Sequence, residues 1–167
     1  RPIIGETRLG IFEILFDWVK DGKKIPIIGD GNNLFQFAND EDLVDVSIET
    51  ATRNLSGFYN IGNQIYSTLN ADLNKFFSKV ESKSRTLPIP NFIAVPSLFI
   101  LDKLNLSPLS SWHYLSYSWS FYYDQKDNYA RLNWRPKKSN VDLLCKAYEW
   151  YLNNEKNLEI NQSPHRK

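Results

Sequence analysis

The 167-residue sequence contains no methionine, a single cysteine and no apolar run long enough to span a bilayer. One thiol, Cys145, excludes an internal disulfide and a cysteine-based zinc site, and it favours a reducing compartment. The N-terminus has no basic segment followed by an apolar one, so we expect a soluble, cytoplasmic protein with no membrane contact. Because Arg1 stands where a translation product carries methionine, we expect the chain to begin inside a longer protein.

The sequence also lacks an excess of either charge. It has 20 Lys and Arg against 19 Asp and Glu, so we expect no nucleic-acid partner. With 42% hydrophobic residues, including 5 Trp, 9 Tyr and 10 Phe, most of the chain can bury a core. We expect one domain over residues 1–155 and a polar, frayed tail over residues 156–167.

Helices are predicted where apolar residues recur at helical spacing. Residues 9–20 carry a wide apolar stripe that Asp21-Gly22 terminates. Further helices are predicted to follow N-capping side chains at Asn39, Thr68, Asp124 and Ser139.

Strands are predicted from short apolar or alternating runs next to glycine. They cover residues 25–28, which a tight turn at Gly29-Asp30-Gly31 follows, residues 35–37 and residues 57–61. The last of these is expected to join a mostly parallel sheet whose other strands lie outside this chain. Pro88 and Pro90 are expected to break the chain before the apolar stretch 92–104, in which Pro96 either kinks a helix or begins one.

Several motifs, each weak alone, occur in a fixed order over about residues 1–155. They are Ile4-Gly5, Gly29-Asp30-Gly31, Phe37 with Asp42-Leu43, Gly57-Phe58-Tyr59-Asn60-Ile61-Gly62, and Leu132-Asn133-Trp134-Arg135-Pro136. This ordered set resembles the C-terminal part of the NAD-dependent epimerase/dehydratase family, the extended short-chain dehydrogenases/reductases. The resemblance implies an α/β chain, mainly helical with short strands. Such a chain forms the C-terminal substrate-binding lobe of an extended Rossmann-type fold and lacks the N-terminal dinucleotide-binding half.

The resemblance implies the substrate-binding portion of an NAD(P)-dependent epimerase, dehydratase or reductase. Its substrate would be a small molecule with a sugar-derived or similar hydroxyl, such as a sugar nucleotide, and its partners would be the missing N-terminal half and a second copy in a homodimer of the parent. The parent would use NAD or NADP, whereas this chain alone is expected to bind neither and to be inactive. The alternative is a non-catalytic ligand-binding or assembly module of the same fold.

No catalytic, cofactor-binding or metal-binding residue is predicted within the chain. The glycine turn at residues 29–32 lacks the third glycine and the helix that a pyrophosphate site needs. The only Tyr-x-x-x-Lys, Tyr122 to Lys126, lies far downstream of the place where the family carries its catalytic pair.

The resemblance and the aromatic-rich stretch 105–123 together select candidate substrate-binding residues. These are Arg8, Phe35, Gln36, Trp112, His113 and Tyr114, of which Arg8, Phe35, Trp112 and His113 are expected to converge on one concave surface.

Each candidate has a structural alternative. Phe35 stands seven residues before Asp42, where nucleotide-sugar enzymes of the family carry a phosphate-binding arginine, and it either lines a pocket or belongs to the core. Arg8 either contacts substrate or is a solvated cation at a helix start. His113 either contacts substrate or satisfies a buried hydrogen bond.

Overall fold

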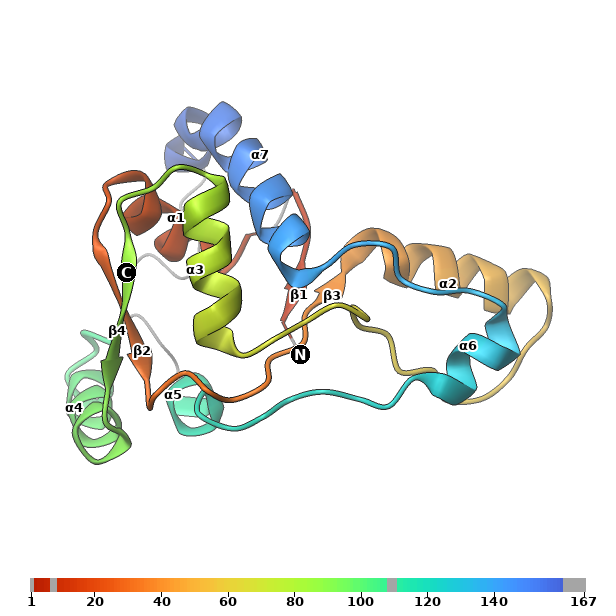
Figure 1. The fold of residues 1–167 in the computed structure, drawn as a ribbon, viewed down its shortest axis with the longest axis horizontal. Coiled ribbons are helices and arrows are strands. Elements are labelled where there is room, and N and C mark those ends of the chain that lie inside the picture. Colours follow the sequence, from red (N-terminus) through yellow and green to blue (C-terminus); the bar gives the residue numbers. More distant parts are fainter. Residues whose placement is uncertain (1, 7–8, 108–110, 161–167) are drawn as a thin grey trace.

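Three helices, α1 (Phe12–Lys20), α3 (Leu69–Lys79) and α7 (Asn140–Ile160), surround the main hydrophobic core (Figure 1). The computed structural model describes residues 2–6, 9–107 and 111–160. The ring of Phe16 lies at the centre of the core, 6.0 Å from the ring of Phe76 and 5.4 Å from that of Tyr148. The apolar stripe predicted for the first helix is thus confirmed as a buried face.

The strands form two small parallel pairs. β1 (Ile3–Ile4) pairs with β3 (Ala38–Asn39), and β2 (Lys24–Ile28) pairs with β4 (Arg85–Ile89). The predicted strand at 25–28 is confirmed within β2.

The expectation that Pro88 breaks the chain is wrong, because Pro88 lies inside β4 opposite Ile27. A two-stranded ribbon has an outer edge on each strand, and a proline there removes no ladder hydrogen bond. The strand predicted at 35–37 is reduced to an isolated bridge between Phe35 and Phe121, and the strand that pairs with β1 begins at Ala38.

The segment predicted as a strand at residues 57–61 forms no strand with the described part of this chain, and its expected pairing with strands outside the chain remains a prediction. This segment has no regular structure, and the side chain of Phe58 is 97% exposed. One carbonyl of the segment and one just before it accept from side chains of a distant helix. Asn128 Nδ2 donates to the carbonyl of Asn60 at 2.6 Å, and Arg131 Nη2 donates to that of Ser56 at 3.0 Å. Within this chain, side-chain donors therefore hold the segment in place.

Two helices form an arm that extends away from the core on the right of Figure 1, namely α2 (Asp40–Thr52) and α6 (Lys126–Leu132). Asn39 occupies the N-cap position of α2, as predicted, but its side chain makes no capping hydrogen bond. The N-cap of α6 is Gln125, one residue later than predicted, while the Asp124 carboxylate accepts from Lys126 N at 3.0 Å. α6 ends at Leu132, and the residue that caps it is Asn133. The backbone of Asn133 is left-handed (φ +50°), a conformation that asparagine tolerates.

The caps of the two long core helices are confirmed. Thr68 Oγ1 accepts from Ala71 N at 3.3 Å at the start of α3. Ser139 Oγ accepts from Asp142 N at 3.1 Å, and the Asp142 carboxylate accepts from Ser139 N in return. The backbone N–H groups of both residues at the start of α7 therefore have hydrogen-bond acceptors. α7 then continues to Ile160.

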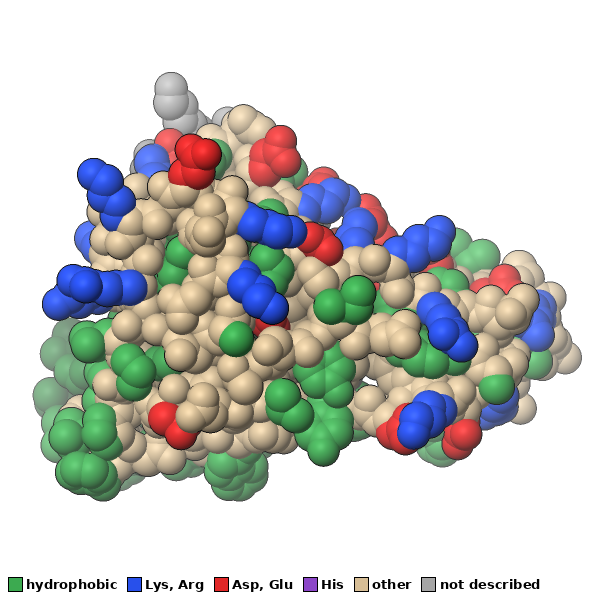
Figure 2. All heavy atoms as spheres, in the orientation of Figure 1, with side chains coloured by type: hydrophobic (Ala, Val, Ile, Leu, Met, Phe, Trp, Pro, Cys, Tyr) green, Lys and Arg blue, Asp and Glu red, His purple; other side chains and the backbone are tan. Residues whose placement is uncertain are grey.

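At the other end of the molecule, α4 (Asn91–Lys103) and α5 (Ser111–Ser116) pack together. α4 continues through Pro96, so the alternative in which this proline begins the helix is wrong. Apolar side chains gather at this end of the surface, at the lower left of Figure 2. None of the described helices is both long enough and apolar enough to cross a bilayer.

Candidate functional site

Two segments that are far apart in the sequence lie side by side at the centre of the molecule, residues 33–37 and residues 117–123. Phe121 N donates to the carbonyl of Leu34 at 2.8 Å, and Gln36 N donates to the carbonyl of Phe121 at 3.0 Å. This crossing brings the predicted residues Phe35 and Gln36 against the aromatic-rich stretch.

Phe35 points into the core. It is 4% exposed, and its ring lies 5.5 Å from the ring of Phe37 and 5.5 Å from that of Tyr117. Of its two predicted alternatives, the structure places it in the core, where it holds the crossing by packing.

Gln36 is buried beside it and uses both ends of its amide. Its Nε2 donates to the carbonyl of Asn63 at 2.6 Å, and its Oε1 accepts from Tyr123 N at 3.0 Å. Gln36 therefore fixes the position of the segment that carries the exposed tyrosines.

Asn140, the first residue of α7, is the polar centre of this region and was not predicted. Its Nδ2 donates to the carbonyl of Phe35 at 2.5 Å and to Asp72 Oδ2 at 2.9 Å. Its Oδ1 accepts from Phe37 N at 3.0 Å and from Asn63 Nδ2 at 3.1 Å. No sequence pattern distinguishes Asn140 from other asparagines, because all four partners are distant along the chain.

The predicted Trp112-His113-Tyr114 triplet lies on α5 with its members facing different ways. Trp112 is 68% exposed, His113 is half-buried, and Tyr114 is 1% exposed with its hydroxyl donating to Asp102 Oδ2 at 3.1 Å. Burial, together with Asp102, raises the pKa of Tyr114. Arg8, the remaining candidate, lies outside the described residues, so its predicted convergence with the others remains a prediction.

An exposed aromatic surface adjoins the crossing. The rings of Tyr66 and Tyr122 stack with their centres 6.2 Å apart, and Tyr122 and Tyr123 are both exposed. Nearby, the guanidinium of Arg135 lies 5.5 Å from the centre of the Tyr129 ring. We call Tyr66, Tyr122, Tyr123, Tyr129 and Arg135 the tyrosine surface. It combines aromatic faces for a planar ring with a cation for an anionic group.

Tyr122 and Lys126, both among the described residues, make no hydrogen bond with each other. Lys126 Nζ lies 3.7 Å from Asp124 Oδ2, and Tyr122 stacks on Tyr66.

The glycine turn after β2 is not built to hold a pyrophosphate. The Asp30 carboxylate accepts from Asn32 N at 3.0 Å and from Asn32 Nδ2 at 2.9 Å, and these bonds lower the pKa of Asp30, so the turn carries a negative charge at neutral pH. A Cβ on Gly31 would lie 2.5 Å from Ile27 Cδ1, so the turn is filled by the chain itself. The described residues of this turn therefore do not fit the pyrophosphate of a dinucleotide.

Metal and thiol chemistry find little support in the described part of the chain. No three His, Cys, Asp or Glu side chains there are grouped so that they could hold a metal ion. Cys145 is partly buried against the core, and burial raises the pKa of its thiol, which keeps it neutral.

Comparisons with known proteins show which proteins this chain resembles. No protein-family model matches the chain. The uncharacterized protein y4nG of Sinorhizobium fredii is 35% identical over 160 residues, which cover 95% of this chain and 40% of that protein.

Several solved structures share the fold. An epimerase from Methanothermobacter thermautotrophicus matches 95% of this chain and 43% of its own, with a TM-score of 0.67 and 15% identity. The UDP-glucuronic acid 4-epimerase of Bacillus cereus, in complex with UDP-glucuronic acid and NAD, matches 91% and 43% respectively, with a TM-score of 0.60 and 14% identity. The chain thus spans about two fifths of the length of the relatives it matches. The resemblance carried by the sequence motifs is confirmed at the level of the fold.

Proposed function

Because the chain is a partial-length structural relative of NAD-dependent epimerases and dehydratases, we propose that it is their C-terminal, substrate-binding portion. In this proposal it serves an NAD(P)-dependent epimerase, dehydratase or reductase whose substrate bears a sugar-derived or similar hydroxyl. The observation that carries the proposal is the fold match over 91–95% of the chain, together with the order of the sequence motifs.

The tyrosine surface is the part of the chain proposed to meet the substrate. Gln36 and Asn140 hold the segments beneath it in fixed positions through buried hydrogen bonds. Stacked phenol rings bind planar or sugar rings by dispersion, and Arg135 can pair with a phosphate or carboxylate. A relative crystallised with UDP-glucuronic acid supports a ligand with both a ring and an anionic group.

The chain by itself is proposed to bind neither NAD nor NADP and to catalyse no hydride transfer. Asp30 places a negative charge at the glycine turn, and Gly31 is packed against Ile27, so the turn does not accept a pyrophosphate. Lys126 pairs with Asp124, which leaves Tyr122 without the lysine partner that lowers a catalytic tyrosine's pKa.

The test is calorimetric titration of the chain with UDP-glucuronic acid, UDP and NAD, alongside an absorbance assay for reduced cofactor. We expect weak, saturable binding of UDP-glucuronic acid that Tyr122→Ala lowers at least fivefold. Phe58→Ala, which removes an exposed ring that lies outside the tyrosine surface, should leave the binding unchanged. Micromolar NAD binding, or turnover lost in Tyr122→Phe, would overturn the proposal.

The second candidate is a non-catalytic ligand-binding or assembly module of the same fold. The exposed apolar side chains of α4 favour it, since large exposed apolar patches mark interaction surfaces. Absence of any binding to the tyrosine surface in the titration above, with the fold intact, would favour this candidate.

A further inference from the structure

An apolar groove of about 420 Å³ lies between α1, the β2–β4 ribbon and α4. α1 supplies Leu15 and Trp18, and α4 supplies Ile93, Ser97 and Leu101. The remaining lining side chains come mainly from β2, Ile89 of β4 and the start of α3. The groove is separate from the tyrosine surface, with which it shares no residue.

The lining of the groove has no charge. Among the described residues that line it, Ser97 and Tyr117 carry the only side-chain hydroxyls, and Trp18 the only side-chain N–H. Burial raises the pKa of Tyr117 to about 12, so this phenol stays neutral at physiological pH. An anionic group placed here would lose its hydration and meet no cation, which is strongly unfavourable.

α4 forms an apolar wall of the groove that is partly exposed to solvent. The helix is apolar on nearly all sides, a pattern typical of a helix that is buried all round. Here Ala94 packs inward, Ile93 and Leu101 line the groove, and Phe99 and Ile100 are exposed. The apolar surface at the lower left of Figure 2 belongs to this end of the molecule.

We propose that this groove binds an uncharged, medium-chain aliphatic molecule with one polar end, such as an aliphatic alcohol. The volume decides the size class, because small-molecule sites span about 300–1,000 Å³ and most of their lining is apolar. The lining decides the charge, because nothing in it can neutralise a phosphate. The hydroxyl of Ser97, on the exposed side of α4, can hydrogen-bond a polar end of the ligand.

This site is independent of the proposed function. The groove is tested by direct binding, with neither NAD nor a sugar nucleotide in the assay. Loss of sugar-nucleotide binding would leave the proposal for the groove intact, and loss of groove binding would leave the tyrosine surface untested.

The experiment is a titration of the full chain with N-phenyl-1-naphthylamine, a neutral probe whose fluorescence rises in apolar sites. Saturable binding at one probe per chain, displaced by 1-decanol and at least tenfold less well by decanoate or UDP, is the expected result. Energy transfer from tryptophan to the bound probe should fall in Trp18→Phe, since Trp18 lines the groove.

Two matched variants separate the groove from the rest of α4. Leu101 lines the groove and is 37% exposed, so a lysine there keeps its ammonium in water, whereas Ile100 is 58% exposed and does not line the groove. We expect Leu101→Lys to weaken probe binding at least tenfold and Ile100→Lys to change it less than twofold. Ser97→Phe, which fills the groove, should also weaken binding.

Three results would overturn the proposal. One is equal loss of probe binding in Leu101→Lys and Ile100→Lys, which would mean adsorption to the exposed patch. Another is displacement by decanoate as effective as that by 1-decanol. The third is no saturable probe binding to the native chain. If sedimentation then shows a dimer that both lysine variants dissociate, a second copy is the occupant.

Discussion

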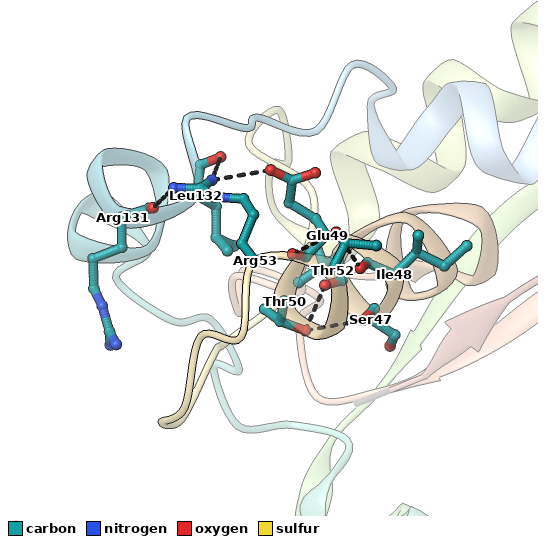
Figure 3. A network of polar contacts seen from close by, with 9 residues as sticks. Ser47, Ile48, Glu49, Thr50, Thr52, Arg53, Arg131 and Leu132 are labelled. Carbon is teal, nitrogen blue, oxygen red and sulfur yellow. Dashed lines mark hydrogen bonds and ion pairs between the residues drawn. The ribbon is translucent and has the colours of Figure 1, made fainter.

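Arg53 and Arg131 each bind the backbone of the other's segment. Arg53 Nη2 donates to the carbonyl of Arg131 at 3.3 Å (Figure 3). Arg131 Nη2 donates to the carbonyl of Ser56 at 3.0 Å. Arg53 Nη1 also donates to the carbonyl of Leu132 at 3.1 Å and to Glu49 Oε1 at 3.0 Å. The two arginines thus join the C-terminal end of α2 to the C-terminal end of α6, where a cation also complements the helix dipole.

We predict that Arg53→Ala loosens the arm without unfolding the core. α6 has only seven residues and does not persist as an isolated helix, so it depends on these contacts. The free energy of unfolding should fall by about 1 kcal/mol, since the guanidinium is partly exposed. Hydrogen exchange of residues 126–132, followed by mass spectrometry, should become at least tenfold faster. Lys137→Ala, an exposed cation beyond α6, is the control, and equal exchange in both variants would contradict the prediction.

A larger effect is predicted for Asn140→Ala. This change removes four buried hydrogen bonds and leaves the carbonyl of Phe35 and the N–H of Phe37 without their partner. Buried groups left unpaired cost about 1–3 kcal/mol each, so we expect a loss of about 3 kcal/mol or more. Urea denaturation measures it. Asn153→Ala, an exposed asparagine on the same helix, should change stability by less than about 0.5 kcal/mol.

The sequence predicted those elements whose signals are local. The stripe of α1 and the caps Thr68 and Ser139 depend on residues within one or two helical turns, and all were confirmed. β4 was missed because Pro88 was interpreted as a break, although the edge of a ribbon needs no N–H there.

Elements and sites held by distant partners could not be predicted in this way. Residues 57–61 have the composition of a strand, but the strands expected to pair with them lie outside this chain. Within the chain, Asn128 and Arg131 supply donors to this segment and to the residue before it. For the same reason the sequence could select Gln36 but not its role, which depends on Asn63 and Tyr123. The family motifs gave the fold because they sample the whole chain rather than one turn.

Stability should fall in acid because of an ion-pair network between α2 and α7. Glu41 accepts from Lys138 Nζ at 2.5 Å and from Lys146 Nζ at 2.7 Å, and these contacts lower the pKa of Glu41 from 4.5 to about 2. Contacts with Lys79 and Ser139 likewise lower the pKa of Asp142 to about 2. Since both pKa values are depressed in the folded state, their stabilisation is complete above about pH 5 and is lost as the pH falls towards about 2.

The size of this pH effect is modest, because the carboxylates are about half exposed. We expect about 0.5 kcal/mol from each group between about pH 5 and pH 2, decreasing in high salt. Urea denaturation across this range should show a shallower pH dependence for Glu41→Gln than for the native chain. Glu149→Gln, at an exposed site on α7, should keep the native dependence, and an equal slope in both variants would count against the network.

The last prediction separates packing from backbone strain at the glycine turn. Gly31 and Gly10 both have positive φ, +72° and +56°, so alanine at either position costs about 1–2 kcal/mol of strain. Only Gly31 is also crowded: an added Cβ would lie 2.5 Å from Ile27 Cδ1 and 2.9 Å from Asn70 Cβ, whereas nothing lies within 4 Å at Gly10. Overpacking adds about 1–3 kcal/mol, so Gly31→Ala should destabilise the chain by at least about 1 kcal/mol more than Gly10→Ala. Thermal and urea unfolding of both variants measure the difference. If the two alanines lower the free energy of unfolding equally, the turn has room for a Cβ at Gly31. Crowding would then no longer be a reason to expect that this turn excludes a pyrophosphate.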